Sequence, residues 1–279
     1  MKYELLALDV DGTLAGPDSK VSPEVIDAVA EAQRAGLRVC IATGRSFIET
    51  IPVWRQLRLH PPYDPMVLIG GALVAEPHTG RTLWQRVISP ALAAEYSDEL
   101  LHAGHSAIAI VDAWRWGFDY YIAEGPDAET VHRRWFAQMN VQVRRVARLA
   151  PAEGDPPPLR INAVVEPAAA PALAERLARQ FDGRLNVHSI LAPNYGVTIV
   201  EAFSREASKW AAIRYVAQTD RIAPARMIAV GDDVNDLPMI RGAGLGVAMP
   251  RAPEAVRAEA DRVAEGGLAK FLHDLLAGA

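Results

Sequence analysis

The chain has a single cysteine, Cys40, among its 279 residues, and no apolar run long enough to cross a membrane. One cysteine cannot form an internal disulfide, so a disulfide-stabilised scaffold is excluded and Cys40 is expected to be a small buried apolar side chain. The apolar stretch before Asp9 is only four residues long, too short for the h-region of a signal peptide. We therefore expect a cytoplasmic protein that does not bind a membrane.

An excess of positive charge is also missing. Lys and Arg number 29 against 34 for Asp and Glu, a formal net charge of −5, and both signs are scattered along the chain. Nucleic-acid binding needs a basic stripe, so nucleic acid is not an expected partner. Half of the residues are hydrophobic and 23% are charged, as in ordinary globular proteins. The sequence gives no indication of the oligomeric state.

The clearest positive feature is an apolar run of strand length, Leu5 to Leu8, followed directly by Asp9 and Asp11. Two acids at the end of a buried strand repel each other and lose hydration unless a cation or several donors offset the cost. A metal site is therefore the leading interpretation. The alternative, in which both acids are simple turn residues before Gly12, does not explain a second acid cluster near the other end of the chain.

Strands and helices alternate after this run. We expect a helix from Ser22 to Ala35, a strand over 37–42, a helix over 47–57 and a strand over 66–69. This order predicts an α/β fold with a doubly wound, mostly parallel sheet, whose ligands lie beyond the carboxyl ends of the strands. We expect residues 1–82 and 194–279 to form this core.

The rhythm changes over residues 83–193, where paired strands mix with helices, and we expect an inserted α+β cap domain. Within it, Trp114, Trp116, Phe118 and Tyr120 would share one face if that stretch were extended. The core is expected to resume with a strand over 197–200. A later strand over 227–230 runs into Gly231-Asp232-Asp233-Val234-Asn235-Asp236, which repeats the layout of a strand followed by acids.

Four polar groupings thus fall at strand ends or helix starts of one sheet: Asp9 with Asp11, Thr43, Lys209, and Asp232 with Asn235 and Asp236. Carboxylates suit a hard cation such as Mg²⁺, which also binds phosphate, and Lys and Thr supply donors for phosphate oxygens. Phosphoryl transfer asks mainly for such positioning and charge neutralisation. Taken alone, Thr43 could be a helix cap, Lys209 an exposed helix lysine, and Asp233 and Asp236 first-turn acids.

These groupings resemble the four motifs of the haloacid dehalogenase (HAD) superfamily, and their spacing resembles the Cof-type phosphatases with a type IIB cap. The matching segments are Asp9-Val10-Asp11-Gly12-Thr13-Leu14, Thr43-Gly44-Arg45, Lys209, and 231–236. The resemblance covers nearly the whole chain. It implies a HAD-like Rossmannoid core and a Mg²⁺-dependent phosphoric monoester hydrolase acting on a small phosphorylated metabolite, with a sugar phosphate as the favoured class.

The resemblance also assigns roles. Asp9 would be the nucleophile that forms an aspartyl-phosphate, and Asp11 the general acid and base. Mg²⁺ would be held by Asp9, the backbone carbonyl of Asp11 and Asp232, with Asp233 and Asp236 acting indirectly. The phosphoryl group would be bound by Gly12, Thr43, Gly44, Lys209 and Asn235.

Three departures from the family pattern bear on substrate range. Trp210 stands where Gly often follows the lysine, Gly70 stands where Asn is usual, and Pro250-Arg251 replaces Gly-Asn. We expect Trp210 to place a bulky group close to the phosphate. Two other functions stay open: a phosphohexomutase of the same fold, and a non-catalytic binding or regulatory module. A dehalogenase is disfavoured, because that chemistry needs no acid at position 11.

Overall fold

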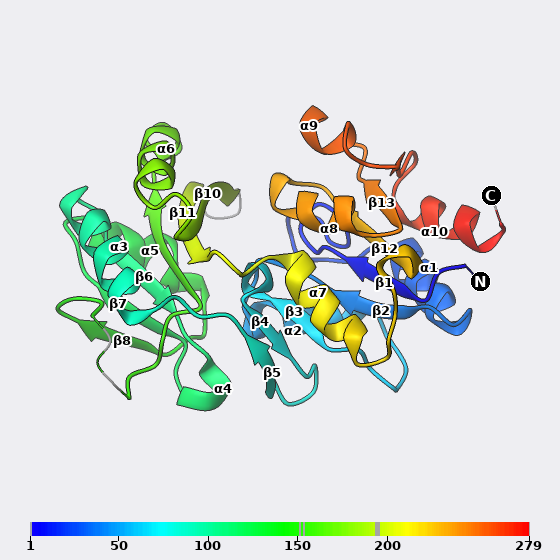
Figure 1. The fold of residues 1–279 in the computed structure, drawn as a ribbon, viewed down its shortest axis with the longest axis horizontal. Coiled ribbons are helices and arrows are strands. Elements are labelled where there is room, and N and C mark those ends of the chain that lie inside the picture. The colour runs from blue at the N-terminus through cyan, green and yellow to red at the C-terminus, as the bar shows by residue number, and fades with distance from the viewer. Residues whose placement is uncertain (1, 151, 153, 193–195, 279) are drawn as a thin grey trace. The chain divides into compact units, whose positions relative to one another are not determined.

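The computed structural model describes residues 2–150, 152, 154–192 and 196–278. The chain forms two compact units, residues 1–84 with 208–279 and residues 85–207, which we call the core unit and the inserted unit. Figure 1 shows the elements of both.

The core unit is built on a five-stranded sheet in which every neighbouring pair of strands is parallel. Its order is β14 (Arg262–Val263), β13 (Leu245–Ala248), β12 (Met227–Gly231), β1 (Leu5–Leu8) and β2 (Arg38–Ile41). Leu8 lies level with Val230 of β12 and with Ile41 of β2. The residues that follow these strands therefore emerge at one edge of the sheet, as expected for a doubly wound fold.

Helices surround this sheet: α1 (Pro23–Arg34), α2 (Phe47–Gln56), α7 (Lys209–Gln218), α8 (Leu237–Gly242), α9 (Glu254–Arg257) and α10 (Leu268–Leu276). The start of α1 follows its sequence signal, since Ser22 accepts a hydrogen bond from Val25 N and Pro23 opens the first turn. Apolar residues of α7 and α8 pack against strand residues such as Leu5 and Ala229. Cys40 belongs to the same cluster and is fully buried, as predicted.

A second, three-stranded sheet completes the core unit. It contains β3 (Met66–Leu68), β4 (Leu73–Ala75) and β5 (Thr82–Gln85), and β3 runs antiparallel to β4. The sequence analysis identified β3 but not the other two strands. The turn between β3 and β4 contains Gly70 and Gly71, which both have positive φ.

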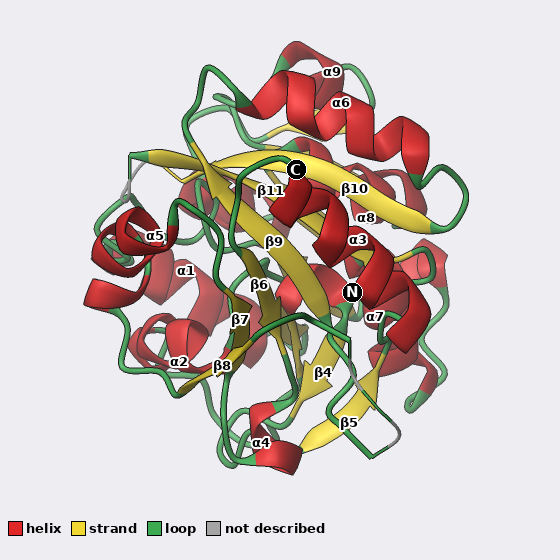
Figure 2. Cartoon of the chain, turned by 90° about the vertical axis from the view of Figure 1, so that its left-hand side faces the viewer, coloured by secondary structure: helices red, strands yellow, loops and turns green. Residues whose placement is uncertain are grey.

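The inserted unit contains a six-stranded mixed sheet. The strand order is β10 (Leu185–Ala192), β11 (Val197–Ser204), β9 (Arg160–Val165), β6 (Ala107–Ile110), β7 (Tyr120–Ala123) and β8 (Val143–Val146). Helices α3 (Pro90–His102) and α6 (Ala170–Gln180) pack on one face, over small residues such as Ala109, Ala163 and Ala202 (Figure 2). A shorter helix, α5 (Ala128–Arg134), follows β7. The expected α+β composition is thus observed.

The expected domain boundary needs correction. Residues 193–195, where it was placed, lie outside the described residues, and β11, expected as a core strand, belongs to the inserted sheet. β11 pairs antiparallel with β10 along its whole length and with β9 on its other side. Both partners come from the inserted segment, so β11 belongs to the inserted unit, which extends to Ala207.

The four aromatic residues at positions 114, 116, 118 and 120 do not lie in one extended stretch. Residues Ala113–Trp116 form a short helix, α4, because Asp112 caps its start and Gly117 ends it in the left-handed region. Trp114 and Trp116 are 53% and 38% exposed, whereas Phe118 and Tyr120 are buried. The stretch is therefore not one extended face.

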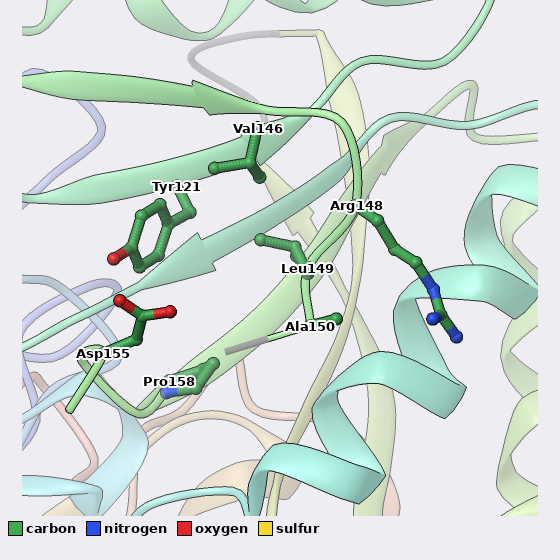
Figure 3. A pocket seen from close by; sticks show the side chains of 7 residues that line it. All are labelled: Tyr121, Val146, Arg148, Leu149, Ala150, Asp155 and Pro158. Carbon is green, nitrogen blue, oxygen red and sulfur yellow. The ribbon is translucent and has the colours of Figure 1, made fainter. Parts of the chain in front are cut away.

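Figure 3 shows a pocket of the inserted unit, lined by Tyr121, Val146, Arg148, Leu149, Ala150, Asp155 and Pro158. Burial, and then the nearby Asp155 carboxylate, raise the pKa of Tyr121. The Arg148 side chain extends away from the other lining residues, and its Nε donates to Oδ1 of Asp98 at 2.7 Å. None of the polar groupings that the sequence singled out lies here. No helix in the described part of the chain has the length and apolar character needed to span a membrane.

Candidate active site

The site forms where β1 and β12 end. The Asp9 N–H donates to the Val230 carbonyl at 3.0 Å, which extends the pairing of the two strands by one residue. Asp9 is 4% exposed, and Asp232 follows the last residue of β12. Two acids from distant parts of the sequence are thus brought to the same edge of the sheet.

Three carboxylates meet there. Oxygen atoms of Asp9, Asp232 and Asp236 all lie within 4.8 Å of one another. Burial, reinforced by Asp236 and Asp232, raises the pKa of Asp9 well above its usual value. Burial and the neighbouring acids Asp236 and Asp233 raise the pKa of Asp232 to about 7. The cluster therefore carries negative charge in an environment that disfavours it.

Lys209 is the buried cation of this cluster. Its Nζ donates to Oδ1 of Asp9 and to Oδ1 of Asp236, both at 2.6 Å, and the side chain is 1% exposed. Burial alone would disfavour the ammonium, but the charges of Asp236 and Asp9 outweigh it and raise the pKa of Lys209. Lys209 is therefore protonated at neutral pH and is not an exposed helix lysine.

The backbone at Lys209 is held from two sides. Ser208 caps α7, since its hydroxyl accepts a hydrogen bond from Ala211 N at 3.1 Å. On the other side Gly71 comes so close that a Cβ on it would lie 2.1 Å from the Ser208 carbonyl oxygen. Only glycine allows this approach, so the Gly70-Gly71 turn fixes the start of α7.

Asp236 links Lys209 to the backbone of the turn after β12 through hydrogen bonds. Its Oδ1 binds Lys209, and its Oδ2 accepts hydrogen bonds from the backbone N–H groups of Asp232 at 2.9 Å and Asp233 at 3.2 Å. Both oxygens are engaged, so Asp9 and Asp232 are better placed than Asp236 to hold a metal. Asp233 accepts a hydrogen bond from Val234 N, the first residue of a 3₁₀ turn, and is a helix-cap residue.

Gly12 leaves space for the Asp232 carboxylate, and its N–H is not available to donate to a phosphoryl oxygen. Its N–H donates to the Ala15 carbonyl at 3.1 Å, so the expected phosphate contact from this amide is not free in this structure. Gly12 has φ +82°, and a Cβ on it would lie 2.1 Å from Oδ2 of Asp232. A side chain at position 12 would therefore displace the Asp232 carboxylate.

Thr43 keeps a donor available for a phosphoryl oxygen, and Gly44 beside it leaves open space. Thr43 is buried after β2, and its Oγ1 accepts from Arg45 N at 3.1 Å, which leaves the hydroxyl proton to donate. A Cβ on Gly44 would meet no atom within 4 Å. Oδ1 of Asn235 is buried without a hydrogen-bond partner among the described residues. As an acceptor it suits a cation or a water molecule, and only the Nδ2 group of Asn235 could donate to a phosphoryl oxygen.

Asp11 lies apart from the carboxylate cluster. Its side chain is 56% exposed and pairs with Arg45, whose Nε donates to Oδ2 at 2.8 Å and whose Nη2 bonds Oδ1. Hydrogen bonding and charge attraction from Asp11 outweigh burial and raise the pKa of Arg45. The sequence analysis placed Arg45 in the second motif but gave it no role. Its only signal was its position after Thr43-Gly44.

One expectation about the rim of the site was wrong. Trp210 does not extend toward the phosphate-binding groups but packs against Gly242 of α8, where a Cβ would lie 2.2 Å from the indole ring. The ring also contacts the core cluster beneath α7. Successive helix residues point about 100° apart, so Lys209 and Trp210 face different surroundings.

The residues fit a divalent cation. Three carboxylates and one ammonium leave a formal excess of two negative charges, and an all-oxygen donor set suits a hard ion. The turn after β12 adds a further oxygen acceptor, the buried Oδ1 of Asn235, which has no hydrogen-bond partner among the described residues. The cluster could therefore hold a metal.

Comparison with known proteins now decides the family. A family model described as haloacid dehalogenase-like hydrolase matches residues 6–272. The chain belongs to this family. It is 28% identical over 285 residues to 5-amino-6-(5-phospho-D-ribitylamino)uracil phosphatase YitU of Bacillus subtilis, covering 98% of this chain and 97% of YitU. It is 26% identical over 271 residues to pyridoxal phosphate phosphatase YbhA of Escherichia coli, with coverage of 94% and 93%.

Among solved structures, the HAD subclass IIB sugar phosphatase BT4131 superposes with a TM-score of 0.77 at 19% identity, covering 98% of each chain. The HAD fold, with a Rossmannoid core and an inserted α+β unit, is thereby confirmed. The expected enzyme class, a phosphoric monoester hydrolase, is confirmed as well.

Proposed function

We propose that this HAD hydrolase is a Mg²⁺-dependent phosphatase of small phosphorylated metabolites, with sugar phosphates as the substrate class, and that it works through an aspartyl-phosphate. The observation that carries the proposal is the position of Asp9, buried beside Asp232 and bonded to Lys209. A nucleophilic carboxylate needs a neighbouring cation and a fixed orientation, and both are present.

Asp9 carries out the first step. Lys209 holds its Oδ1, so its Oδ2 attacks phosphorus in line with the ester oxygen. A bond forms between Asp9 and phosphorus, the bond from phosphorus to the ester oxygen breaks, and Asp11 gives that oxygen a proton. Asp11 then removes a proton from a water molecule, which attacks the aspartyl-phosphate, releases inorganic phosphate and restores the Asp9 carboxylate.

The phosphoryl oxygens need donors that do not move during the reaction. Lys209 uses two of its three protons on Asp9 and Asp236 and retains one to donate. The Thr43 hydroxyl and the Nδ2 group of Asn235 supply further donors, and Gly44 leaves room for the phosphoryl group beside Thr43. Mg²⁺ would be held by the carboxylates of Asp9 and Asp232 and the backbone carbonyl of Asp11, and it would neutralise the charge that gathers on the phosphoryl group.

The names of the relatives support the substrate class. YitU and YbhA are named for small phosphorylated compounds, and BT4131 for sugar phosphates. We propose a substrate of this kind for the present chain, and a cytoplasmic location, where such metabolites occur.

The test is a panel of phosphate esters assayed for phosphate release with Mg²⁺ and with EDTA, using wild type, Asp9→Asn and the exposed-site control Asp274→Asn. We expect turnover that requires Mg²⁺, loss of turnover in Asp9→Asn with an unchanged circular dichroism spectrum, and full activity in the control. Unchanged activity of Asp9→Asn would remove the proposed nucleophile. Isomerisation of a hexose phosphate without phosphate release would favour a mutase.

A further inference from the structure

We propose that Arg45 is a positioning residue that aims the carboxylate of Asp11 and thereby controls protonation of the leaving group. The proposal rests on the function above, because it takes Asp11 as the acid of the first step. It adds a role for a residue whose guanidinium touches neither Asp9 nor Lys209 in the hydrogen bonds of the described chain.

The contact has a defined geometry. Nε of Arg45 donates to Oδ2 of Asp11 at 2.8 Å, and Nη2 bonds Oδ1 of the same carboxylate. Such a two-point contact fixes the plane of the carboxylate as well as its position. Within the described residues, these are the side-chain hydrogen bonds that Asp11 makes, so Arg45 alone sets its orientation.

Exposure makes this restraint important. The Asp11 side chain is 56% exposed and that of Arg45 is 14% exposed. An exposed aspartate without a partner samples several rotamers, whereas the enclosed guanidinium can hold it in one. Each carboxylate oxygen still has a second lone pair outside the two-point contact, and this position can carry the proton that Asp11 gives to the leaving-group oxygen.

Arg45 is itself fixed by the phosphate-binding segment. Its N–H donates to Oγ1 of Thr43 at 3.1 Å, and its carbonyl accepts from Ile69 N at 2.9 Å. The residue that orients the acid is therefore tied to Thr43, a proposed donor to the phosphoryl oxygens. The backbone that carries the guanidinium is thus held beside Thr43.

The experiment compares two substrates that differ in their need for the acid. A p-nitrophenyl ester leaves readily without protonation, whereas an alkyl phosphate from the panel does not. We measure kcat/KM, which covers steps only up to phosphoryl transfer, for wild type, Arg45→Ala, Arg45→Lys and the exposed control Arg55→Ala. Because general acid catalysis contributes about 10²–10⁴-fold, loss of aim should lower kcat/KM for the alkyl ester about 10- to 100-fold in Arg45→Ala. The p-nitrophenyl ester should change less than about threefold.

Further measurements separate positioning from a merely structural role. Arg45→Lys should recover only part of the alkyl activity, because an ammonium cannot form the two-point contact. Added guanidinium ion should partly rescue Arg45→Ala on the alkyl ester. In an Asp11→Asn background, Arg45→Ala should cause no additional loss of kcat/KM. A residue that acts only by orienting the Asp11 carboxylate has no effect once that acid is removed.

Equal losses on both esters, or an additive loss in the Asp11→Asn background, would overturn the proposal and indicate that Arg45 binds the phosphoryl group itself. Changes in Arg55→Ala as large as those in Arg45→Ala would overturn it too. Absence of turnover by the wild type on every ester is a different failure: it removes the proposed function, and the role of Arg45 with it.

Discussion

Lys209→Met is expected to destabilise the core unit strongly. Lys209 is 1% exposed, and its ammonium lies 2.6 Å from both Asp9 and Asp236, which are buried as well. Methionine fills a similar volume but leaves both carboxylates without their cation. Removing one partner of a buried ion pair typically costs about 3–5 kcal/mol, because the remaining charge stays desolvated. The corresponding drop in melting temperature is about 6–20 °C for a unit of this size.

The assay is urea unfolding followed by tryptophan fluorescence at pH 7 with EDTA present, so that no cation replaces the lysine. The control is Lys270→Met, the same substitution at an exposed lysine whose Nζ lies 2.5 Å from Asp274. An exposed pair of this kind contributes about 0–1 kcal/mol, so the control should change little. Adding Asp236→Asn to Lys209→Met should recover part of the loss, because one of the two stranded acids is then gone.

A loss below about 1 kcal/mol in Lys209→Met would refute this reasoning. It would mean that Asp9 and Asp236 lose their charge or gain water at little cost, and that Lys209 does not hold the cluster together. The activity of Lys209→Met gives an independent reading, since loss of one fixed donor to a reacting group costs about 10²–10³-fold in kcat.

Three further predictions follow from the geometry. Mg²⁺ should stabilise the wild type by about 2.7 kcal/mol at a hundred times its Kd but leave Asp232→Asn unchanged, as measured by thermal shift with Mg²⁺ or EDTA; an equal response of the variant would contradict a metal contact at Asp232. Gly12→Ala should lower kcat/KM at least tenfold, because its Cβ would lie 2.1 Å from the Asp232 carboxylate, whereas Gly36→Ala, with positive φ but no atom within 4 Å, should stay fully active and cost about 1–2 kcal/mol. In the inserted unit, burial opposes ionisation of Glu201, but Arg160 and His188 lower its pKa below the usual 4.5. The stabilisation from this charge is present above pH 4.5 and is lost as the pH falls through the lower folded value, so Glu201→Gln should cost more at pH 7 than at pH 3 in urea unfolding.

The position of the carboxylate cluster could be predicted from the sequence because it depends on a topological rule. Asp9 and Asp232 each follow a short apolar strand, and neighbouring parallel strands end at the same edge. No knowledge of side-chain packing was needed. The same rule placed Thr43 after β2.

Side-chain direction could not be predicted in the same way. The sequence placed Asp11 beside Asp9, yet its carboxylate turns to Arg45, a residue 34 positions away. It gave Asp236 an indirect role, but the two backbone N–H groups that occupy its Oδ2 follow only from the tight turn at 232–236. Such choices depend on which donors the folded backbone presents, and no local pattern records them.

Strand pairing was the other limit. The segment that became β11 reads as an apolar strand in either unit, and only its partners β9 and β10 assign it to the inserted sheet. The aromatic alternation from Trp114 to Tyr120 left the conformation at Trp114 and Trp116 open, and the Asp112 cap and Gly117 favour a short helix there. Local capping outweighed a weak period-two pattern.

The glycines of the site link local turns to contacts between distant parts of the chain. Gly12, Gly71 and Gly231 each look like local turn signals, but the space of a Cβ is taken in each case by a distant or functional group: Asp232, Ser208 and Asp236 in turn. A substitution at any of them would therefore move a carboxylate or the lysine helix as well as straining a turn. A glycine that predicts a turn in the sequence therefore also marks a position where another part of the site comes close. These glycines are needed to bring the charged side chains together.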